Sequence, residues 1–348
     1  MKLLSLLSLI SLGAASPIES SPSSPSVEVK IENIGNTTVK AIVTSHHDRD
    51  LNILKLGSII DDVDLERVNV FSGDNNIQFQ GIRLYIDMDH LAETAFVKLP
   101  AGGSLDKTFD VAKFYDLSAG GDFKIQASGY LQYAEPGSTK VTGIIPYSSE
   151  FITKVDGAEA KAIFSASQIQ EEIKRSTFVR QTCNSNQQNI VKNALSLCQK
   201  NSQQAAKAAR SGPPKRMKEY FKSDSRNTRE IVGKVFDDIA TECKSSISGQ
   251  LSISCKDTDF CKSNRGVPAY SVGKEVVLCP PWFKQPVNGK CHQGDKASVI
   301  IHEFAHGLKG FPDFGVYGYD KLLKLPADKN IRHADTYTYF SNAVEVNC

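Results

Sequence analysis

Residues 299 to 320 read VIIHEFAHGLKGFPDFGVYGYD and contain the pattern His-Glu-x-x-His, with its fixed positions at His302, Glu303 and His306. Asp295 lies just upstream and is a typical helix N-cap residue, and the chain after it favours a helix as far as Gly307. Two histidines four residues apart share one helix face, so both imidazoles reach a single Zn²⁺. Glu303 would lie beside the metal, placed to take a proton from water as a general base.

A catalytic zinc needs a third protein ligand and one position left open. Asp313 is the nearest following carboxylate and comes after Gly310 and a sharp Gly-Phe-Pro turn, so we predict it as the third ligand. Asp320 is the alternative carboxylate. A glutamate ligand on a later helix could come only from Glu345, and Pro312 occupies the position where metzincins carry a third histidine.

Two tyrosines follow the predicted ligands. The phenol of Tyr317 is our candidate for donating a hydrogen bond to the oxyanion that forms during peptide hydrolysis, and Tyr319 is its rival. Either could instead be a packed aromatic residue. His292 and His333 belong to no such pattern, and we interpret both as ordinary polar residues.

The start of the chain has the order of a secretory signal peptide over residues 1–15. Lys2 is followed by an apolar run from Leu3 to Leu12 and then by the small residues Gly13-Ala14-Ala15. The run is shorter than a membrane span requires, and no later stretch is apolar for long enough. We therefore predict a secreted, extracellular protein that is not held in a membrane.

Cysteine placement divides the chain, because no cysteine precedes residue 183. An even number of cysteines in a secreted chain favours disulfides, and the chain has no Cys-x-x-Cys zinc motif. A bridge between two predicted helices would contribute about 3 to 4 kcal/mol in the chain-entropy model. The eight cysteines are Cys183, Cys198, Cys243, Cys255, Cys261, Cys279, Cys291 and Cys348, and of these Cys198 and Cys243 each lie on a predicted long helix.

The basic pair Lys174-Arg175 lies just upstream of the first cysteine. Such a pair is either the solvated end of a helix or a processing site, and its position favours processing. We predict a propeptide domain over residues 16–175 and a metallopeptidase domain over residues 176–348.

Charge separates the same two parts. Residues 16–175 carry 15 Lys and Arg against 23 Asp and Glu, a net charge of −8, whereas residues 176–348 carry 25 against 16, a net charge of +9. Opposite charges favour association of the two parts, and salt would weaken it. No nucleic-acid recognition motif accompanies the basic part, so specific nucleic-acid binding is not expected. We expect a monomer.

Hydrophobic periodicity gives the fold class as α+β. The first part contains alternating or β-branched runs that predict an antiparallel sandwich or barrel, and the second part opens with two amphipathic helical stretches and a small β region. The strand-like runs are VEVKIEN (27–33), TVKAIVTS (38–45), IQFQGIRLYIDM (77–88) and FKIQASGYLQYA (123–134), and the helical stretches cover 186–210 and 228–247.

The chain resembles the deuterolysin family of fungal secreted zinc metallopeptidases, the aspzincins, which include neutral protease 2. The likeness rests on HEFAH, on GFPDFGVYGY, on the closing HADTYTYFSNAVEVNC with its last cysteine, on the cysteine spacing and on the β-rich first part. It extends along nearly the whole chain. Because His-Glu-x-x-His is a generic motif, the closing segment is the more diagnostic feature.

The resemblance implies a zinc endopeptidase, mainly helical and zincin-like, made as an inactive preproprotein. It implies a ligand set of two histidines and one aspartate, with proteins or peptides as substrates and basic proteins among them. It also implies that the propeptide acts as an intramolecular inhibitor or chaperone. The implied disulfides are Cys183–Cys255, Cys261–Cys279 and Cys291–Cys348, which leaves Cys198–Cys243 as an additional pair.

One departure from the family pattern concerns the predicted aspartate. The family motif Gly-Thr-x-Asp-x-x-Tyr-Gly has Phe311 in place of threonine here and one extra residue before Tyr317. An alternative function is therefore a secreted zinc-binding or surface-binding protein with lost or reduced peptidase activity. Intact Glu303 favours the enzyme, because a purely structural metal site needs no base.

Overall fold

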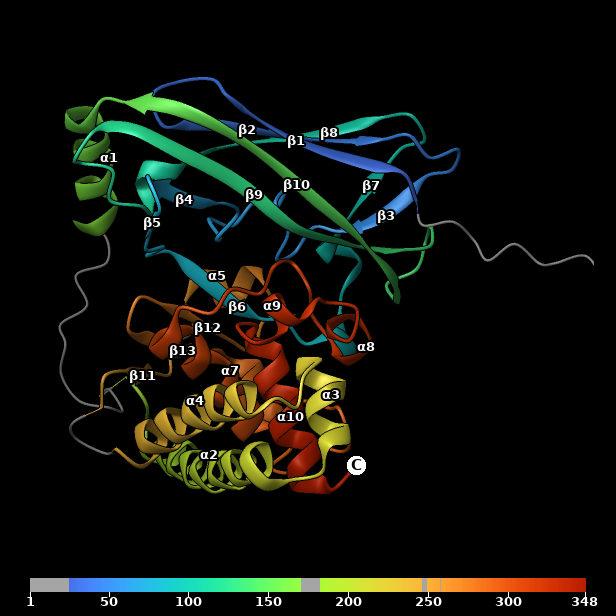
Figure 1. The fold of residues 1–348 in the computed structure, drawn as a ribbon, viewed down its shortest axis with the longest axis vertical. Coiled ribbons are helices and arrows are strands. Elements are labelled where there is room, and N and C mark those ends of the chain that lie inside the picture. The colour runs from blue at the N-terminus through green and yellow to red at the C-terminus, as the bar shows by residue number, and fades with distance from the viewer. Residues whose placement is uncertain (1–24, 170–181, 246–248, 257) are drawn as a thin grey trace, which may run out of the picture.

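The computed structural model describes residues 25–169, 182–245, 249–256 and 258–348. Figure 1 shows two regions, a β-rich N-terminal region over residues 25–169 and a mainly helical C-terminal region over residues 182–348. The predicted signal peptide and the pair Lys174-Arg175 lie outside the described residues. Among the residues described, no helix is long and apolar enough to cross a membrane.

The N-terminal region contains two antiparallel sheets that share one hydrophobic core. The first sheet has the order β1 (Val27–Asn33), β2 (Thr38–Ser45) and β8 (Ser104–Asp110), and β2 alternates strictly between buried and half-buried residues. The second has the order β5 (Asn75–Ile77), β4 (Asn69–Ser72), β9 (Gly121–Ala134), β3 (Leu51–Leu54) and β7 (Phe96–Leu99), with β10 (Val141–Val155) also paired to β9. Short 3₁₀ turns cover Met88–His90, Glu93–Ala95 and Val111–Lys113, and helix α1 (Gly157–Ile169) follows β10.

Five helices build most of the C-terminal region: α2 (Ser185–Ser211), α3 (Pro214–Phe221), α4 (Arg226–Lys244), α7 (Lys296–Lys309) and α10 (Ala334–Val346). The two predicted helical stretches correspond to α2 and α4. Asn184 caps α2 in a capping box with Gln187, and Ser225 caps α4. Single turns α5 (Asp259–Ser263), α6 (Pro280–Lys284), α8 (Tyr319–Leu322) and α9 (Ala327–Asn330) complete the set among the residues described.

A third sheet combines strands from both regions. Its order is β11 (Ser252–Ser254), β13 (Glu275–Leu278), β12 (Ala269–Val272) and β6 (Ile82–Tyr85). The N-terminal strand β6 pairs antiparallel with β12, with Leu84 opposite Tyr270 and Tyr85 opposite Ala269. In Figure 1, β6 leaves the upper sheets and lies beside the strands of the C-terminal region.

The expectation of one continuous strand over 77–88 is therefore wrong. The run divides into β5, which stays in the N-terminal region, and β6, which does not. Gly81 lies at the break, where an added Cβ would come within 2.8 Å of the Phe114 ring, so the chain passes too close to its own core for a side chain.

A separate apolar cluster joins the two regions. From the N-terminal region it includes Leu56, Leu84 and Ile86, and from the C-terminal region Tyr270 and Tyr317. The two regions therefore bury hydrophobic surface against each other, in addition to pairing strands.

Four disulfides, all in the C-terminal region, link the cysteines in the pairs that the family resemblance implies. Cys198–Cys243 joins α2 to α4, and Cys291–Cys348 links the loop before α7 to the segment that follows α10. The structure has no free cysteine among its described residues. Disulfide bonds therefore contribute to the stability of the C-terminal region, whereas the N-terminal region depends on non-covalent contacts.

Candidate metal centre and active site

Helix α7 carries the His-Glu-x-x-His residues in a fully packed setting. Asp295 accepts a hydrogen bond from the Ser298 backbone N–H at 2.8 Å, and the Ser298 hydroxyl accepts one from the Asp295 backbone at 2.7 Å. The helix runs slightly past the predicted end at Gly307 and stops at Gly310, which adopts the left-handed conformation with φ 65°.

The two histidines of α7 are oriented by hydrogen bonds on their far sides. His302 Nδ1 donates to Asp335 Oδ1 at 2.9 Å, and His306 Nδ1 donates to the Phe311 carbonyl. These bonds fix the protons on Nδ1 and leave both Nε2 atoms as free lone pairs. Burial lowers the pKa of His306 to about 3, which also favours the neutral ring that a metal ligand requires.

The third predicted ligand faces the same point. The two Nε2 atoms lie 2.9 Å apart, and Asp313 approaches His302 Nε2 at 3.5 Å and His306 Nε2 at 3.3 Å. Asp313 Oδ1 is buried without a hydrogen-bond partner. This arrangement fits a bound cation, because two nitrogen lone pairs and a carboxylate face one point and no proton lies between the nitrogens. Two imidazoles and one carboxylate are a ligand set that zinc prefers.

The alternative carboxylates lie elsewhere. Asp320 is exposed on α8, and Glu345 is half-buried on α10; neither belongs to the group of potential ligands around His302 and His306. Asp313 in contrast is only 8% exposed, and burial raises its pKa to about 7, although nearby His302 and His333 act in the opposite direction.

Two supporting residues were missed by the sequence reasoning. Asp335, at the start of α10, accepts the hydrogen bond from His302; burial acts to raise the pKa of Asp335, but hydrogen bonds from His302 and from the Gly318 backbone keep it below the usual carboxyl value. His333 was interpreted as an ordinary polar residue, but it is fully buried and its Nε2 donates to the carbonyls of Asp313 and Val316, at 3.1 and 3.0 Å. Both residues lie in HADTYTYF, the segment that carried the resemblance but was given no role.

Glu303 is fully buried next to the proposed metal position. Burial raises its pKa well above the usual carboxyl value, while Ser271 and the backbone N–H of Tyr85 act against that shift. Neither carboxylate oxygen has a hydrogen bond of normal geometry. A buried carboxylate with spare acceptor capacity is suited to accept a proton.

The two candidate tyrosines differ clearly. Tyr317 is buried, with its hydroxyl 3.4 Å from Asp313 Oδ2, and its main chain exchanges two hydrogen bonds with the Gln132 side chain of β9. Tyr319 points away from this group, because its hydroxyl donates to Glu219 and its ring stacks on His292 with centroids 3.3 Å apart. Tyr317 is thus the tyrosine brought to the ligands.

Strand β6 crosses directly over this group. The Leu84 carbonyl oxygen lies 3.2 Å from His302 Nε2, although the hydrogen bond to Asp335 leaves that nitrogen without a proton. Two acceptors facing each other at this distance again fit a cation between them. The main-chain carbonyl of Leu84 therefore brings the N-terminal region into direct contact with the ligand group.

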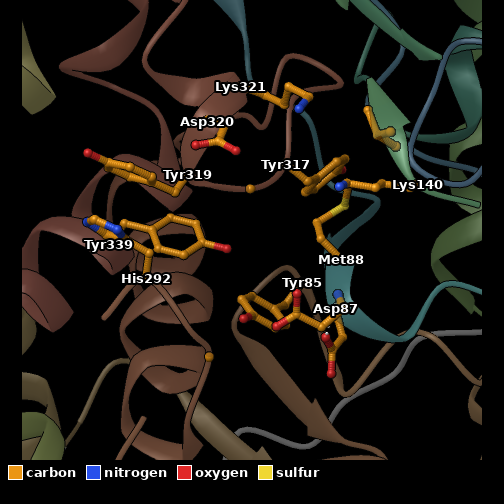
Figure 2. Close-up of a pocket in the computed structure, with 14 residues that line it drawn as sticks. Tyr85, Asp87, Met88, Lys140, His292, Tyr317, Tyr319, Asp320, Lys321 and Tyr339 are labelled. Carbon is orange, nitrogen blue, oxygen red and sulfur yellow. Dashed lines mark hydrogen bonds between the residues drawn. The ribbon is translucent and has the colours of Figure 1, made fainter. Parts of the chain in front are cut away.

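A pocket of about 440 Å³ opens beside the crossing strand. Figure 2 shows Met88 and Lys140 of the N-terminal region beside Tyr317 on the right, and Tyr319 and Tyr339 of the C-terminal region on the left, so both regions line it. The pocket is next to the ligand group and continues the path of β6 beyond Tyr85.

A helical histidine pair, a facing carboxylate and a buried glutamate, all beside a sheet edge that takes an extended strand, define a metal-dependent peptidase. Comparison with known proteins gives the family. The sequence profile of the Deuterolysin metalloprotease (M35) family matches residues 2–348, and the chain belongs to this family. It is a zinc metalloendopeptidase of the deuterolysin type, which confirms the resemblance drawn from the sequence.

Curated relatives agree over nearly the full length. A neutral protease 2 homolog of Colletotrichum graminicola is 37% identical over 92% of each chain. One of Phaeosphaeria nodorum is 35% identical over 100% of this chain and 99% of its own. Among solved structures, the collagen adhesin of S. aureus aligns with 39% of this chain and 51% of its own, at 16% identity and a TM-score of 0.16, which is too low to support an argument.

Proposed function

We propose that this chain is a secreted zymogen whose C-terminal region hydrolyses peptide bonds in proteins and whose N-terminal region is the propeptide. Residues 16–175 would be removed by cleavage after Lys174-Arg175. The observation that carries the proposal is the Leu84 carbonyl, 3.2 Å from His302 Nε2. A substrate-like backbone at the ligand group accounts both for a peptidase site and for its inactivity before processing.

In this proposal His302, His306 and Asp313 hold the zinc ion. When bound, zinc supplies a Lewis acid that polarises the substrate carbonyl and makes water easier to deprotonate. Glu303 takes a proton from the attacking water and later passes it to the leaving nitrogen. The Tyr317 hydroxyl donates to the developing oxyanion once it is released from its contact with Asp313.

Latency in this proposal comes from occlusion of the site. The N-terminal region has no cysteine that could bind the metal, so a cysteine switch is excluded. Instead β6 occupies the free edge of β12, where an extended peptide would add as a strand. Strand β9 reinforces the cover, because Tyr130 N–H donates to the Phe314 carbonyl at 2.9 Å and Gln132 holds Tyr317.

Substrate choice in this proposal rests mainly on backbone pairing. A preference for basic proteins, implied by the resemblance, requires a surplus of acidic groups in the cleft. On the C-terminal wall of the pocket Asp320 is the one carboxylate, and Lys321 balances it. We therefore propose that pairing with β12 attracts unfolded or extended protein segments whatever their net charge.

Four disulfides support an extracellular location, where such bonds persist. We propose that the processed chain acts as a monomer, because the ligand group is supplied entirely by one chain.

The decisive experiment compares precursor with processed enzyme on an unlabelled protein substrate, with and without a zinc chelator. Precursor blocked by Lys174→Ala and Arg175→Ala should be inactive, and the processed form should be active until chelated. Equal digestion by both forms would refute latency. A processed form that binds zinc but digests nothing would favour the alternative, a zinc-binding protein without peptidase activity.

A further inference from the structure

The loop over residues 311–318, which we call the Asp313 loop, is contacted by one face of β9. Buried and half-buried residues alternate along most of β9, and Gln132 lies on the half-buried face. Gln132 is nevertheless only 1% exposed, because the C-terminal region covers that end of the strand. Ser128 and Tyr130 precede it on the same face, and both contact Lys329. Three successive residues of this face therefore meet the C-terminal region.

The Gln132 side chain bonds to both main-chain groups of Tyr317. Its Oε1 accepts a hydrogen bond from the Tyr317 N–H at 2.7 Å, and its Nε2 donates to the Tyr317 carbonyl at 3.2 Å. On the same strand, the Tyr130 N–H donates to the Phe314 carbonyl at 2.9 Å. Strand β9 thus holds the Asp313 loop at the residue directly after Asp313 and again at Tyr317.

The main chains of the strand and the loop touch between these two points. An added Cβ at Gly315 would lie 2.5 Å from the Tyr130 carbonyl oxygen, and one at Gly129 would lie 2.9 Å from the Phe314 carbonyl oxygen. Neither approach leaves room for a side chain. The N-terminal region therefore fixes the path of the loop, and does not merely lie above it.

The conformation of the Asp313 loop depends on such support. Phe314 has φ 55°, in the left-handed region that residues other than glycine rarely adopt. A residue stays in such a conformation only where its surroundings hold it. The C-terminal region contributes through His333, which bonds to the Asp313 carbonyl at 3.1 Å, and β9 adds the bonds to Phe314 and Tyr317.

The conformation that β9 holds is also the one that can bind a metal. In it, the potential ligand atoms of His302, His306 and Asp313 all lie within 4.8 Å of one another. The histidines are fixed on a helix, whereas Asp313 comes from a loop. Support of the loop should therefore affect the third ligand more than the first two.

We propose that Gln132 is a positioning residue for the third metal ligand, so that the N-terminal region promotes zinc binding in addition to covering the site. This inference rests on the proposed function, in which His302, His306 and Asp313 hold zinc. If β9 favours the zinc-binding loop, then zinc must favour the covered state by the same factor, because coupling between two sites is reciprocal. The precursor is then the form that acquires the metal, and the processed enzyme holds zinc less tightly.

The test measures the zinc affinity of the full-length precursor, made uncleavable by Lys174→Ala and Arg175→Ala. In this chain Gln132→Met keeps a side chain of similar length and removes both hydrogen bonds to Tyr317. Competition with a chelator of known affinity should show a zinc dissociation constant raised about tenfold, within the range typical of coupling between two sites. Activity is not needed for this readout.

Gln126→Met in the same precursor is the matched control. Gln126 lies on the same face of β9, but its side chain donates to Glu150 of its own region, at 2.9 Å. Its substitution should leave the zinc dissociation constant unchanged. Melting temperatures of both variants verify folding.

Processing provides a second comparison. Removal of residues 16–175 turns the cleavable wild-type and Gln132→Met precursors into the same chain, so their zinc affinities and kcat/KM values should then agree. Both processed forms should bind zinc more weakly than the wild-type precursor does. A difference confined to the precursors assigns the effect to β9.

The outcomes separate this inference from the proposed function. An unchanged zinc dissociation constant in folded Gln132→Met precursor would overturn the positioning role and leave the peptidase function standing. If that variant does not fold, the wild-type chain decides, because a precursor that binds zinc no more tightly than processed enzyme overturns the inference equally. Failure of every form to bind zinc would instead refute the proposed ligand set.

Discussion

Strands β13 and β6 pair with the two edges of β12 in the same antiparallel manner, yet they come from different regions. β13 follows β12 after a two-residue turn, Gly273-Lys274, and belongs to the C-terminal region throughout. β6 lies far earlier in the chain and reaches β12 across the interface. One edge of β12 is therefore paired within the C-terminal region, and the other is paired with a strand of the N-terminal region.

The comparison teaches that the proposed catalytic residues and the proposed inhibitory strand belong to different regions of the chain. Potential ligands, base and disulfides all lie in the C-terminal region, whereas the covering strand lies in the N-terminal region. Substitutions should therefore change activity with opposite sign in the two regions, and the predictions below test that contrast.

The largest effect is expected for Asp313→Ala in the C-terminal region. Removing one of the three proposed ligands should lower zinc content severely and abolish hydrolysis, measured by metal analysis and protein digestion of the processed form. Asp320→Ala is the control and should retain zinc, since Asp320 is exposed and outside the ligand group. If the Asp320 variant loses metal and the Asp313 variant keeps it, the assignment is reversed.

Glu303→Gln should separate binding from catalysis within the same region. Glutamine keeps the size of the side chain and removes the base, so zinc content should stay normal while turnover falls about 10²- to 10⁴-fold. Metal analysis and kcat of the processed form give both values. Near-normal turnover would move the base to another residue.

Tyr85→Ala in the N-terminal region should act in the opposite direction. Emptying a site filled by a buried aromatic side chain weakens the hold of the propeptide, so the inhibition constant of separately added propeptide should rise about tenfold or more. Ile152→Ala is the control because Ile152 is 74% exposed on β10. Equal inhibition by both variants would show that the Tyr85 side chain of β6 does not contribute to propeptide binding.

The smallest effect is expected from salt. The sequence suggested that the net charges of −8 and +9 hold the regions together, but the described contacts around the site are main-chain pairing and apolar packing. Raising ionic strength should therefore slow association of added propeptide and change its dissociation rate little. Surface plasmon resonance measures both rates, and a strongly salt-dependent dissociation rate would restore the charge model.

Sequence patterns that act over a few residues were sufficient to predict part of the secondary structure. Asp295 and the His302–His306 spacing predicted helix α7 and the placement of both histidines on one of its faces, because N-caps and helical spacing act within a few residues. The mixed α and β character followed from periodicity for the same reason. The disulfide partners came from the family resemblance, since spacing alone leaves the connectivity open.

What the sequence did not predict depends on distant contacts. Ile82–Tyr85 carries three β-forming apolar or aromatic residues besides Arg83, and these suit a strand in either sheet, so no local pattern indicates that it leaves its own region. The role of His333 likewise depends on the loop carbonyls of Asp313 and Val316, which only folding brings to it. Non-local partners of this kind are invisible to a window of neighbouring residues.

The order of β6 and α7 along the chain has a consequence for biosynthesis. A ribosome produces the covering strand and the sheets around it long before it produces His302, Asp313 and Asp335, and domains generally fold in the order of their synthesis. The N-terminal region, which we propose to be the inhibitor, can therefore fold before the residues of the catalytic site are synthesised. Under the proposed latency, a cell that makes this chain need never contain the uncovered enzyme, because each new active site would form against a strand that has already folded.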